Sequence, residues 1–331
     1  MLATSPLRIG TLGAARITPM ALLRPALAVP EVAVTAVAAR DPERARRFAA
    51  KHGIARVHTD YAALIADPEL DAIYNPLPNS HHYEWTIRAL EAGKHVLCEK
   101  PLAANAAEAE RMAQAAAATG RVLMEAFHYR YHPAIKRLKE ITDSGELGRI
   151  RHIETHMCVP LLRPGDIRYR YDLAGGATMD LGCYTISLLR YLAAAEPEVT
   201  RAQARLSSPN LDRYMRADFR FADGRTGHMT CSLFSTVLLR LSAVVRGDRG
   251  EVSLLNPWLP HLYHRLTWRT ERGTTVERLR GEATYTYQLR AFAAAVCERA
   301  AVPTDATEAI ANLRVIDAVY RAAGLPPRVS S

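Results

Sequence analysis

The feature that most constrains the fold is an alternation of short apolar runs with helical patterns over the first 125 residues. Five runs have the length and composition of buried strands, at residues 7–12, 32–38, 71–75, 95–98 and 121–124. The second run is apolar on both faces, which is typical of a strand inside a parallel sheet. Helix starts such as Asp41-Pro42 lie between the runs. Strands that alternate with helices predict βαβ units and a doubly wound parallel sheet.

After residue 125 the pattern changes. Six strand-like segments follow with few helices between them, at residues 150–157, 199–206, 214–221, 227–235, 239–245 and 263–269. Tight turns such as Ala222-Asp223-Gly224 join several of them, which favours an antiparallel sheet. Helical patterns remain at residues 132–142, 288–300 and 306–323. The 331 residues therefore predict two domains, an α/β domain at 1–125 and an α+β domain at 126–331.

The composition limits the class of protein and its partners. The chain has 43 Lys and Arg against 34 Asp and Glu. The basic residues are spread among acidic ones, which argues against a nucleic-acid-binding protein and fits an anionic cofactor or small-molecule substrate. No apolar run reaches the ~18 residues of a membrane-spanning helix, and residues 1–7 lack the features of a signal peptide. Five scattered cysteines without a CxxC pair suit a reducing, cytoplasmic environment.

A glycine turn follows the first predicted strand. The segment from Gly10 to Thr18 reads GTLGAARIT, and a dinucleotide site needs a tight turn and small residues at this place. Only Gly13 matches the glycine fingerprint strictly, while Ala15 takes a second small position. Such a turn also occurs through ordinary packing. Its place in the first βα unit favours a pyrophosphate site at the helix N-terminus, formed by Gly13, Ala15, Arg16 and Ile17.

The end of the second predicted strand indicates which dinucleotide is bound. NAD sites place an acidic residue there to hold a ribose hydroxyl. In this chain the position is Ala39, followed by Arg40. A small neutral residue and a guanidinium leave room and charge for a 2′-phosphate. Asp41 is nearby but is better placed to cap the next helix. We therefore expect NADP(H) in preference to NAD(H).

Lysine is rare in this chain and marks one position. There are five lysines and 38 arginines. One of the five lies in Glu99-Lys100-Pro101, directly after the predicted strand at 95–98. Ligands bind at the carboxyl ends of strands in open α/β sheets. An ammonium there provides a compact donor with a tunable pKa, which a guanidinium does not.

Three segments resemble one family of enzymes. They are residues 76–82 (PLPNSHH), 92–101 (AGKHVLCEKP) and 175–184 (GGATMDLGCY). Together with the glycine turn they resemble the glucose–fructose oxidoreductase / inositol dehydrogenase / MocA family along nearly the whole chain. The resemblance implies an N-terminal Rossmann domain with a doubly wound parallel sheet. It also implies a C-terminal α+β domain with a large open, mostly antiparallel sheet, and a nicotinamide cofactor bound between the two.

The same resemblance implies partners and residue roles. Members usually form dimers or tetramers through the C-terminal sheet, so a homodimer or homotetramer is expected. By the family pattern Lys100 lies beside the nicotinamide and the reacting oxygen. Four further residues would line the cofactor groove, namely Pro78, Asn79, His82 and Glu99.

One departure from the family pattern narrows the activity. Many members carry Asp-x-x-x-His in the third segment, whereas this chain has Asp180-x-x-x-Tyr184. That form, with segments 125–133 and 165–169, resembles the branch of glucose–fructose oxidoreductase, trans-dihydrodiol dehydrogenase, xylose dehydrogenase and sugar 3-ketoreductases. We expect hydride transfer at a CH–OH or C=O group of a sugar or sugar derivative. The alternatives are a trans-1,2-dihydrodiol dehydrogenase and a non-catalytic dinucleotide-binding sensor.

The chemistry of the site follows from three side chains. On a helix, Asp180 and Tyr184 share one face. A free tyrosine has a pKa near ~10, and a neighbouring ammonium such as Lys100 would lower it. Tyr184 would then exchange a proton with the substrate, Lys100 would polarise the substrate oxygen, and Asp180 would orient the substrate or Lys100. The alternative is that Asp180 and Tyr184 form a buried structural pair.

Two further residues could contact the substrate, His128 and Arg168. His128 and His132 have the spacing of a metal pair on a helix, but no carboxylate completes the set. We therefore expect no metal, with packing or substrate contact for His128. Arg168 could reach the substrate or cofactor, or form a salt bridge with Asp166 in its loop.

Overall fold

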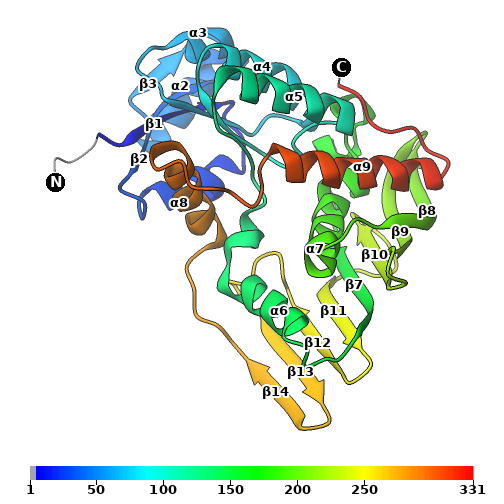
Figure 1. The fold of residues 1–331 in the computed structure, drawn as a ribbon. Helices are drawn as coiled ribbons and strands as arrows, with labels where there is room; N and C mark the ends of the chain where they lie inside the picture. Colours follow the sequence, from blue (N-terminus) through cyan, green and yellow to red (C-terminus); the bar gives the residue numbers. More distant parts are fainter. Residues whose placement is uncertain (1–4, 164, 331) are drawn as a thin grey trace. The chain divides into compact units, whose positions relative to one another are not determined.

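The apolar runs of the first part form one six-stranded parallel sheet in the computed structural model, which describes residues 5–163 and 165–330. The strand order is β3-β2-β1-β4-β5-β6, and each neighbouring pair is parallel. The predicted Rossmann-type sheet is therefore confirmed (Figure 1). The strands are β1 Leu7–Leu12, β2 Val32–Ala38, β3 Arg56–His58, β4 Ala72–Asn75, β5 His95–Cys98 and β6 Leu123–Glu125.

The helices of this part begin where the sequence supplies a cap. Asp41 accepts a hydrogen bond from the Glu43 backbone N–H at 3.0 Å, and Pro42 occupies the first turn of α2. Asp60 caps α3 in the same way. The first helical segment after the glycine turn starts as a π turn at Pro19–Leu23 and continues as α1 Arg24–Ala26. The others are α2 Pro42–His52, α3 Tyr61–Ala66, α4 His82–Glu91, α5 Ala106–Thr119 and α8 Thr284–Cys297.

The later strands form a second sheet of eight strands. Its order is β14-β13-β12-β11-β7-β10-β9-β8, and only β7 and β10 run parallel. The prediction of a large, mostly antiparallel sheet is confirmed. The strands are β7 Ile150–Cys158, β8 Glu198–Ser208, β9 Leu211–Arg220, β10 Thr226–Ser232, β11 Arg240–Gly247, β12 Gly250–Leu255, β13 Arg265–Thr270 and β14 Gly273–Glu277.

The described residues divide into two units. Unit 1 contains residues 5–103, 107–128 and 285–309, and unit 2 contains residues 104–106, 129–284 and 310–330, apart from residue 164. Segment 104–106 lies before residue 125 but belongs to unit 2, and segment 285–309 lies after it but belongs to unit 1. The single domain boundary after residue 125 therefore stays a prediction.

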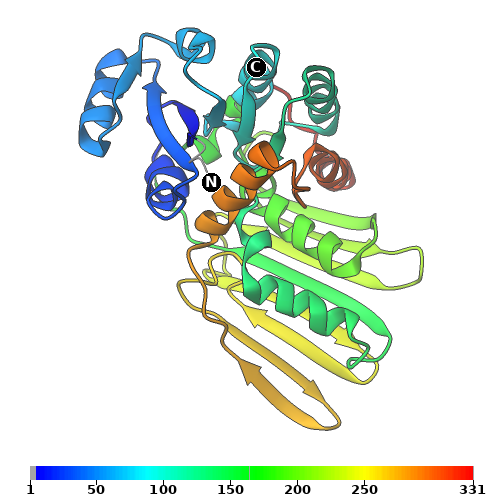
Figure 2. The same ribbon diagram turned by 60° about the vertical axis from the view of Figure 1, so that its left-hand side comes forward.

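Helices cover one face of the eight-stranded sheet. Figure 2 shows α6 Pro133–Asp143 and α7 Cys183–Ala193 on the same side of it. On β7, the hydroxyl of Thr155 donates to the carbonyl of Thr185 in α7 at 3.0 Å. Side chains alternate along a strand, so His152, Glu154 and His156 lie on the opposite face. The remaining helix of unit 2 is α9 Ala306–Ala322.

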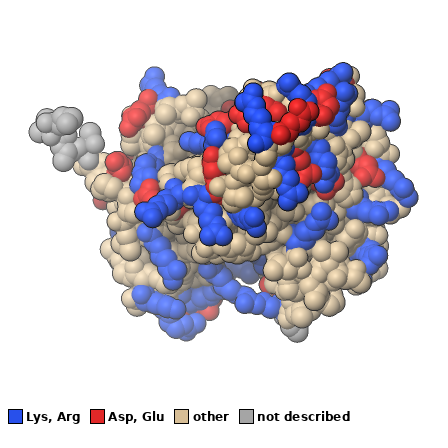
Figure 3. Space-filling model, turned by 90° about the horizontal axis from the view of Figure 1, so that it is seen from below, with Lys and Arg blue, Asp and Glu red and all other residues tan. Residues whose placement is uncertain are grey.

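The face away from α6 and α7 carries charged side chains in paired positions. Glu154 forms an ion pair with Arg246, and a ring nitrogen of His156 lies 3.3 Å from its other carboxylate oxygen. His228 on β10 lies 2.6 Å from Asp218 on β9. Figure 3 shows basic side chains scattered over one face of the molecule, with acidic ones among them and uncharged surface between. Charge on this sheet is therefore arranged as local pairs.

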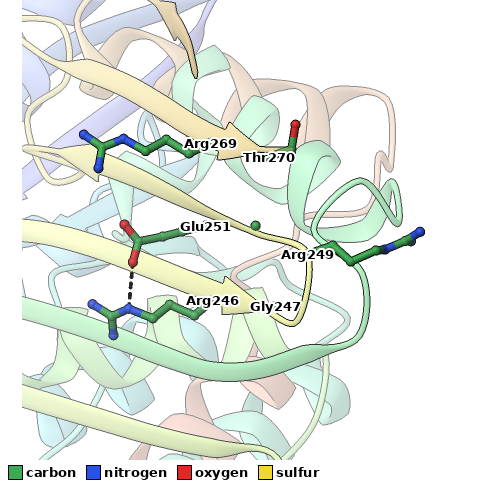
Figure 4. A pocket seen from close by; sticks show the side chains of 7 residues that line it. Arg246, Gly247, Arg249, Glu251, Arg269 and Thr270 are labelled. Atoms are coloured by element: carbon green, nitrogen blue, oxygen red, sulfur yellow. Dashed lines mark hydrogen bonds and ion pairs between the residues drawn. The ribbon is translucent and has the colours of Figure 1, made fainter. Parts of the chain in front are cut away.

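A shallow hollow of about 360 Å³ lies on β11, β12 and β13. Figure 4 shows the side chains of Arg246, Glu251 and Arg269 next to one another, whereas Arg249 points away from them. The guanidinium of Arg246 donates to Glu251 at 2.6 Å. None of the predicted site residues lines this hollow.

Among the helices of residues 5–163 and 165–330, not one has the length and hydropathy needed to cross a membrane.

Candidate active site

The glycine turn has the geometry of a phosphate-binding loop. Gly13 has a φ of +83°, a left-handed conformation that favours glycine. Its N–H donates to the carbonyl of Ala38 at 2.6 Å, which ties the turn to the end of β2. A Cβ at Gly13 would lie 3.3 Å from a methyl carbon of Leu77 and 3.6 Å from the hydroxyl of Tyr61. The turn is therefore both left-handed and closely packed, as a dinucleotide cradle requires.

The other predicted residues of the turn lead into the helical segment. Ala15 and Ile17 are half-buried, and Arg16 between them is exposed. Thr18 donates its backbone N–H to Ala15 at 3.2 Å, and Ala21 donates to Ile17 at 2.9 Å. These residues form the first hydrogen-bonded turns after β1. Their backbone N–H groups therefore lie at the start of the helix, where an anion is favoured.

The end of β2 presents a small residue and two arginines. Ala39 is buried at 4% exposure, and Arg40 is exposed. Burial raises the pKa of Tyr61. The positive charges of Arg40 and Arg44 and the backbone N–H of Arg40 oppose this rise, so both arginines lie near Tyr61. Arg44 also donates to the carbonyl of Ala14 at 2.8 Å, which links α2 to the glycine turn. Arg44 was not predicted as a site residue from the sequence, although it follows Arg40 by four residues.

At the ends of β4 and β5 the side chains bond to one another and to the backbone. The hydroxyl of Tyr74 donates to Glu99 at 2.7 Å. His82 is fully buried, with its two ring nitrogens each 2.8 Å from a carbonyl, of Leu77 and of Pro101. Burial lowers the pKa of His82 to about 4. His82 thus links the loop after β4 to the segment that holds Glu99 and Lys100.

The remaining predicted residues of unit 1 follow β4, β5 and β6 in the chain. Pro78 and Asn79 are half-buried and start a short turn at Asn79–His81. Lys100 is half-buried and donates its backbone N–H to Glu99 at 3.4 Å. His128 is buried, and its ring lies 4.0 Å from that of Tyr285. Burial and the charge of Glu99 raise the pKa of Tyr285.

In unit 2 the structure joins two predicted residues that are twelve positions apart. The guanidinium of Arg168 donates to Asp180 at 2.6 Å and to Asp166 at 3.2 Å. Asp180 and Asp166 raise the pKa of Arg168. The loop salt bridge with Asp166 is therefore present, and it orients Arg168 toward Asp180. The side chain of Asp180 keeps 16% exposure, so it is accessible to a small molecule.

Tyr184 lies one helical turn after Asp180, among aromatic rings. Asp180 belongs to a π turn at Thr178–Gly182, and Tyr184 is the second residue of α7. The ring of Tyr184 lies 5.7 Å from Tyr129 and 5.8 Å from Trp258. The indole of Trp258 donates to the carbonyl of His156 on β7 at 3.2 Å. These contacts leave Tyr184 6% exposed and fix the direction of its ring.

The structure describes no cluster of three His, Cys, Asp or Glu side chains suited to a metal ion within residues 5–163 and 165–330. His132 instead caps α6, where its ring nitrogen accepts the backbone N–H of Ala134 at 3.1 Å.

Two family models match the chain. One describes an oxidoreductase family with an NAD-binding Rossmann fold and matches residues 7–127. The other describes the GFO/IDH/MocA C-terminal domain and matches residues 135–253. The chain belongs to the GFO/IDH/MocA oxidoreductase family. The resemblance seen in residues 76–82, 92–101 and 175–184 is thereby confirmed, and the protein is an oxidoreductase.

Members of the GFO/IDH/MocA family with named activities are similar over nearly the whole chain. The D-xylose 1-dehydrogenase (NADP(+)) 2 of Haloferax volcanii is 34% identical, covering 95% of this chain and 96% of the relative. The dTDP-3,4-didehydro-2,6-dideoxy-alpha-D-glucose 3-reductase of Streptomyces violaceoruber is 35% identical, covering 96% of each. The crystal structure of KijD10, a 3-ketoreductase from Actinomadura kijaniata with NADP and TDP-benzene, superposes with a TM-score of 0.89. Its identity is 30%, covering 96% of this chain and 98% of KijD10.

Proposed function

We propose that the protein is an NADP-dependent oxidoreductase that transfers hydride between nicotinamide and a CH–OH or C=O group of a sugar or sugar derivative. One observation carries this proposal: Arg168 is hydrogen-bonded to Asp180, and Asp180 lies on the helical segment that also carries Tyr184. The segment presents a carboxylate and a phenol from adjacent turns, and these groups can hydrogen-bond to substrate hydroxyls and exchange a proton with them. The printed activities of the xylose dehydrogenase and the ketosugar reductase support the same substrate class.

The residues at the end of β2 fit NADP(H). Ala39 leaves the position of the ribose-binding acid small and neutral, and Arg40 and Arg44 bring two guanidinium groups to the same place. Arg40 and Ala39 would accept the 2′-phosphate, while Gly13, Ala15, Arg16 and Ile17 would hold the pyrophosphate. The NADP in the KijD10 structure supports this preference. When bound, the nicotinamide ring supplies or accepts the hydride.

Five side chains act on the substrate or hold a group that does. Lys100 polarises the substrate oxygen through its ammonium group. Tyr184 exchanges the proton at that oxygen, and Asp180 orients the substrate while Arg168 holds the carboxylate in place. His128 contacts the substrate from its position against Tyr285.

Of the other strand-end residues, two border the cofactor and two hold the segments around it. Pro78 and Asn79 border it, and Glu99 fixes the start of the Lys100 segment through its bond from Tyr74. His82 is fully buried and its neutral ring has one N–H to donate to a neighbouring carbonyl, so it acts by packing between the two loops rather than by direct contact.

The test is a substrate panel with the purified protein. Aldoses, keto-sugars and trans-dihydrodiols are each offered with NADP(H) and with NAD(H), and the absorbance of the reduced nicotinamide is followed. We expect turnover with a sugar and a preference for NADP(H). Turnover with dihydrodiols alone would reassign the substrate, and cofactor binding without any turnover would favour a sensor.

We also propose that the protein is a homodimer or homotetramer assembled through the face of the eight-stranded sheet away from α6 and α7. This face offers charged groups of both signs, such as Glu154, Arg216 and Arg269, for pairing with a second copy. Light scattering after gel filtration measures the assembly, and a monomeric mass at all concentrations contradicts it.

A cytoplasmic location is proposed as well, because no disulfide joins any of the five cysteines, Cys98, Cys158, Cys183, Cys231 and Cys297. Cell fractionation tests it.

A further inference from the structure

The last residues of the described chain place an arginine in the interior of unit 2. Arg328 is 1% exposed, and its guanidinium has no exposed surface. It follows α9 by six residues, and it packs over the rings of Tyr320 and Tyr171 at 4.3 and 4.9 Å. A buried guanidinium is costly unless each of its groups is bonded. Its three bonding partners therefore identify what it does.

The first partner is the carboxylate of Asp212 on β9. Arg328 donates to one oxygen of Asp212 at 2.8 Å, and Tyr320 donates to the same oxygen at 3.0 Å. The other oxygen accepts the backbone N–H and the hydroxyl of Thr178, both at 2.7 Å. Thr178 is the first residue of the π turn that carries Asp180. Asp212 thus caps the start of the segment that continues into Tyr184, and Arg328 neutralises that cap.

The second partner belongs to the loop that carries Arg168. Arg328 donates to the carbonyl of Gly175 at 2.9 Å. Gly175 donates its N–H to the carbonyl of Arg170, and Gly176 donates to that of Arg168 at 2.9 Å. The third bond is local, to the carbonyl of Pro326. One guanidinium therefore bonds to both the loop of Arg168 and the cap of the helix that carries Asp180.

The packing at this point leaves no room for a different arrangement. Gly176 has a φ of +122°, and a Cβ there would lie 2.2 Å from Asp212 and 3.0 Å from Arg328. The buried pair therefore requires glycine at position 176, whereas a Cβ at Gly175 would lie 2.6 Å from the backbone carbonyl oxygen of Arg168. The pairing spans 116 positions of sequence.

We propose that Arg328 is a positioning residue for the reaction: by holding Asp212 and Gly175 together it fixes Asp180 and Tyr184 relative to Arg168. The inference rests on the proposed function of Asp180 and Tyr184. Without the guanidinium, the buried carboxylate of Asp212 keeps its hydrogen bonds from Tyr320 and Thr178 but loses its positive partner, which favours a shift of the helix start toward water or another donor. A displacement of about 1 Å at reacting groups is enough to lower turnover about 100-fold.

The test compares Arg328→Met, Arg328→Lys and Asp212→Asn with Arg321→Met as a control. Arg321 is an exposed arginine seven residues earlier, whose only described pair is a 3.9 Å contact with Asp317. We expect Arg328→Met to lower kcat about 100-fold with an NADPH Kd within twofold of wild type. Arg328→Lys keeps the charge but cannot span both partners, so it should recover about tenfold of the loss. Hydrogen exchange of residues 174–184 should accelerate in Arg328→Met and in Asp212→Asn, with no change in peptides of residues 7–40.

Unchanged exchange of residues 174–184 in both Arg328→Met and Asp212→Asn overturns the proposal, whatever the activity. The proposal is also overturned if Arg328→Lys lowers kcat, NADPH affinity and unfolding temperature together. Such a general loss indicates a structural role alone. If Arg328→Met does not fold, Arg328→Lys and Asp212→Asn decide by the same two measurements. Hydrogen exchange needs no substrate, so a wild-type protein that fails the substrate panel contradicts the proposed function without deciding this inference.

Discussion

The predicted site residues of unit 1 and those of unit 2 are held in place by different kinds of interaction. In unit 1 the glycine turn and the ends of β4 and β5 depend on backbone geometry, such as the left-handed Gly13 and the two carbonyls that hold His82. In unit 2 the residues around Asp180 depend on side chains, with Arg168 bonded to the carboxylate and aromatic rings around Tyr184. Backbone geometry restricts residue type locally, whereas side-chain pairs join distant segments. The first half is therefore easier to recognise in a sequence.

The largest expected effect breaks the half in unit 1. Lys100→Met should lower kcat about 1000-fold, because it removes the only proposed cation at the reacting oxygen. The change is measured as the initial rate with the substrate found in the panel. Lys51→Met is the matched control, since Lys51 is exposed on α2 and should retain full activity. A Lys100→Met variant with wild-type kcat would remove this residue from the mechanism.

The second effect breaks the half in unit 2. Tyr184→Phe should lower kcat about 100- to 1000-fold while the ring contacts with Tyr129 and Trp258 keep the fold. The control is Tyr129→Phe, which loses a 2.8 Å hydrogen bond to Ser187 but no proposed role in proton exchange. If the two phenylalanine variants lose the same activity, Tyr184 has a packing role only.

The same contrast explains how much could be predicted from the sequence. Both sheets were predicted because most of their strands bury apolar residues. Three strands were missed, namely β3, β12 and β14, and neither β3 nor β14 has a buried side chain. Arg168 and Asp180 were each named, but the sequence could not pair them across twelve positions. The bond between Asp212 and Arg328 joins residues whose separation leaves no local signal.

The third prediction compares buried histidines in the two units. Burial, followed by the charge of Arg240, lowers the pKa of His156 on β7 to about 4 from its ordinary 6.5. The unfolded chain therefore binds more protons below pH 6.5, so stability falls as the pH drops from 6.5 toward 4. The loss attributable to His156 should reach about 2–3 kcal/mol at pH 4.5. His82 in unit 1 has a pKa of about 4 as well and should add to the same window.

The measurement is urea unfolding at pH 7.5, 6.0 and 4.5. His156→Gln should be less sensitive to pH than wild type. A His156→Gln variant with the full pH dependence would show that His156 does not titrate in this range.

The smallest effect sharpens the cofactor half alone. Arg40→Ala should weaken NADPH binding about 10- to 100-fold, the size of one or two charge-assisted hydrogen bonds, and change NADH binding less than threefold. Titration calorimetry with each cofactor measures the two values, and Arg47→Ala on the exposed side of α2 serves as the control. Arg44 bonds to the glycine turn through Ala14, so Arg44→Ala should weaken both cofactors. Equal losses for NADPH and NADH in Arg40→Ala would mean that Arg40 supports the turn and does not read the 2′-phosphate.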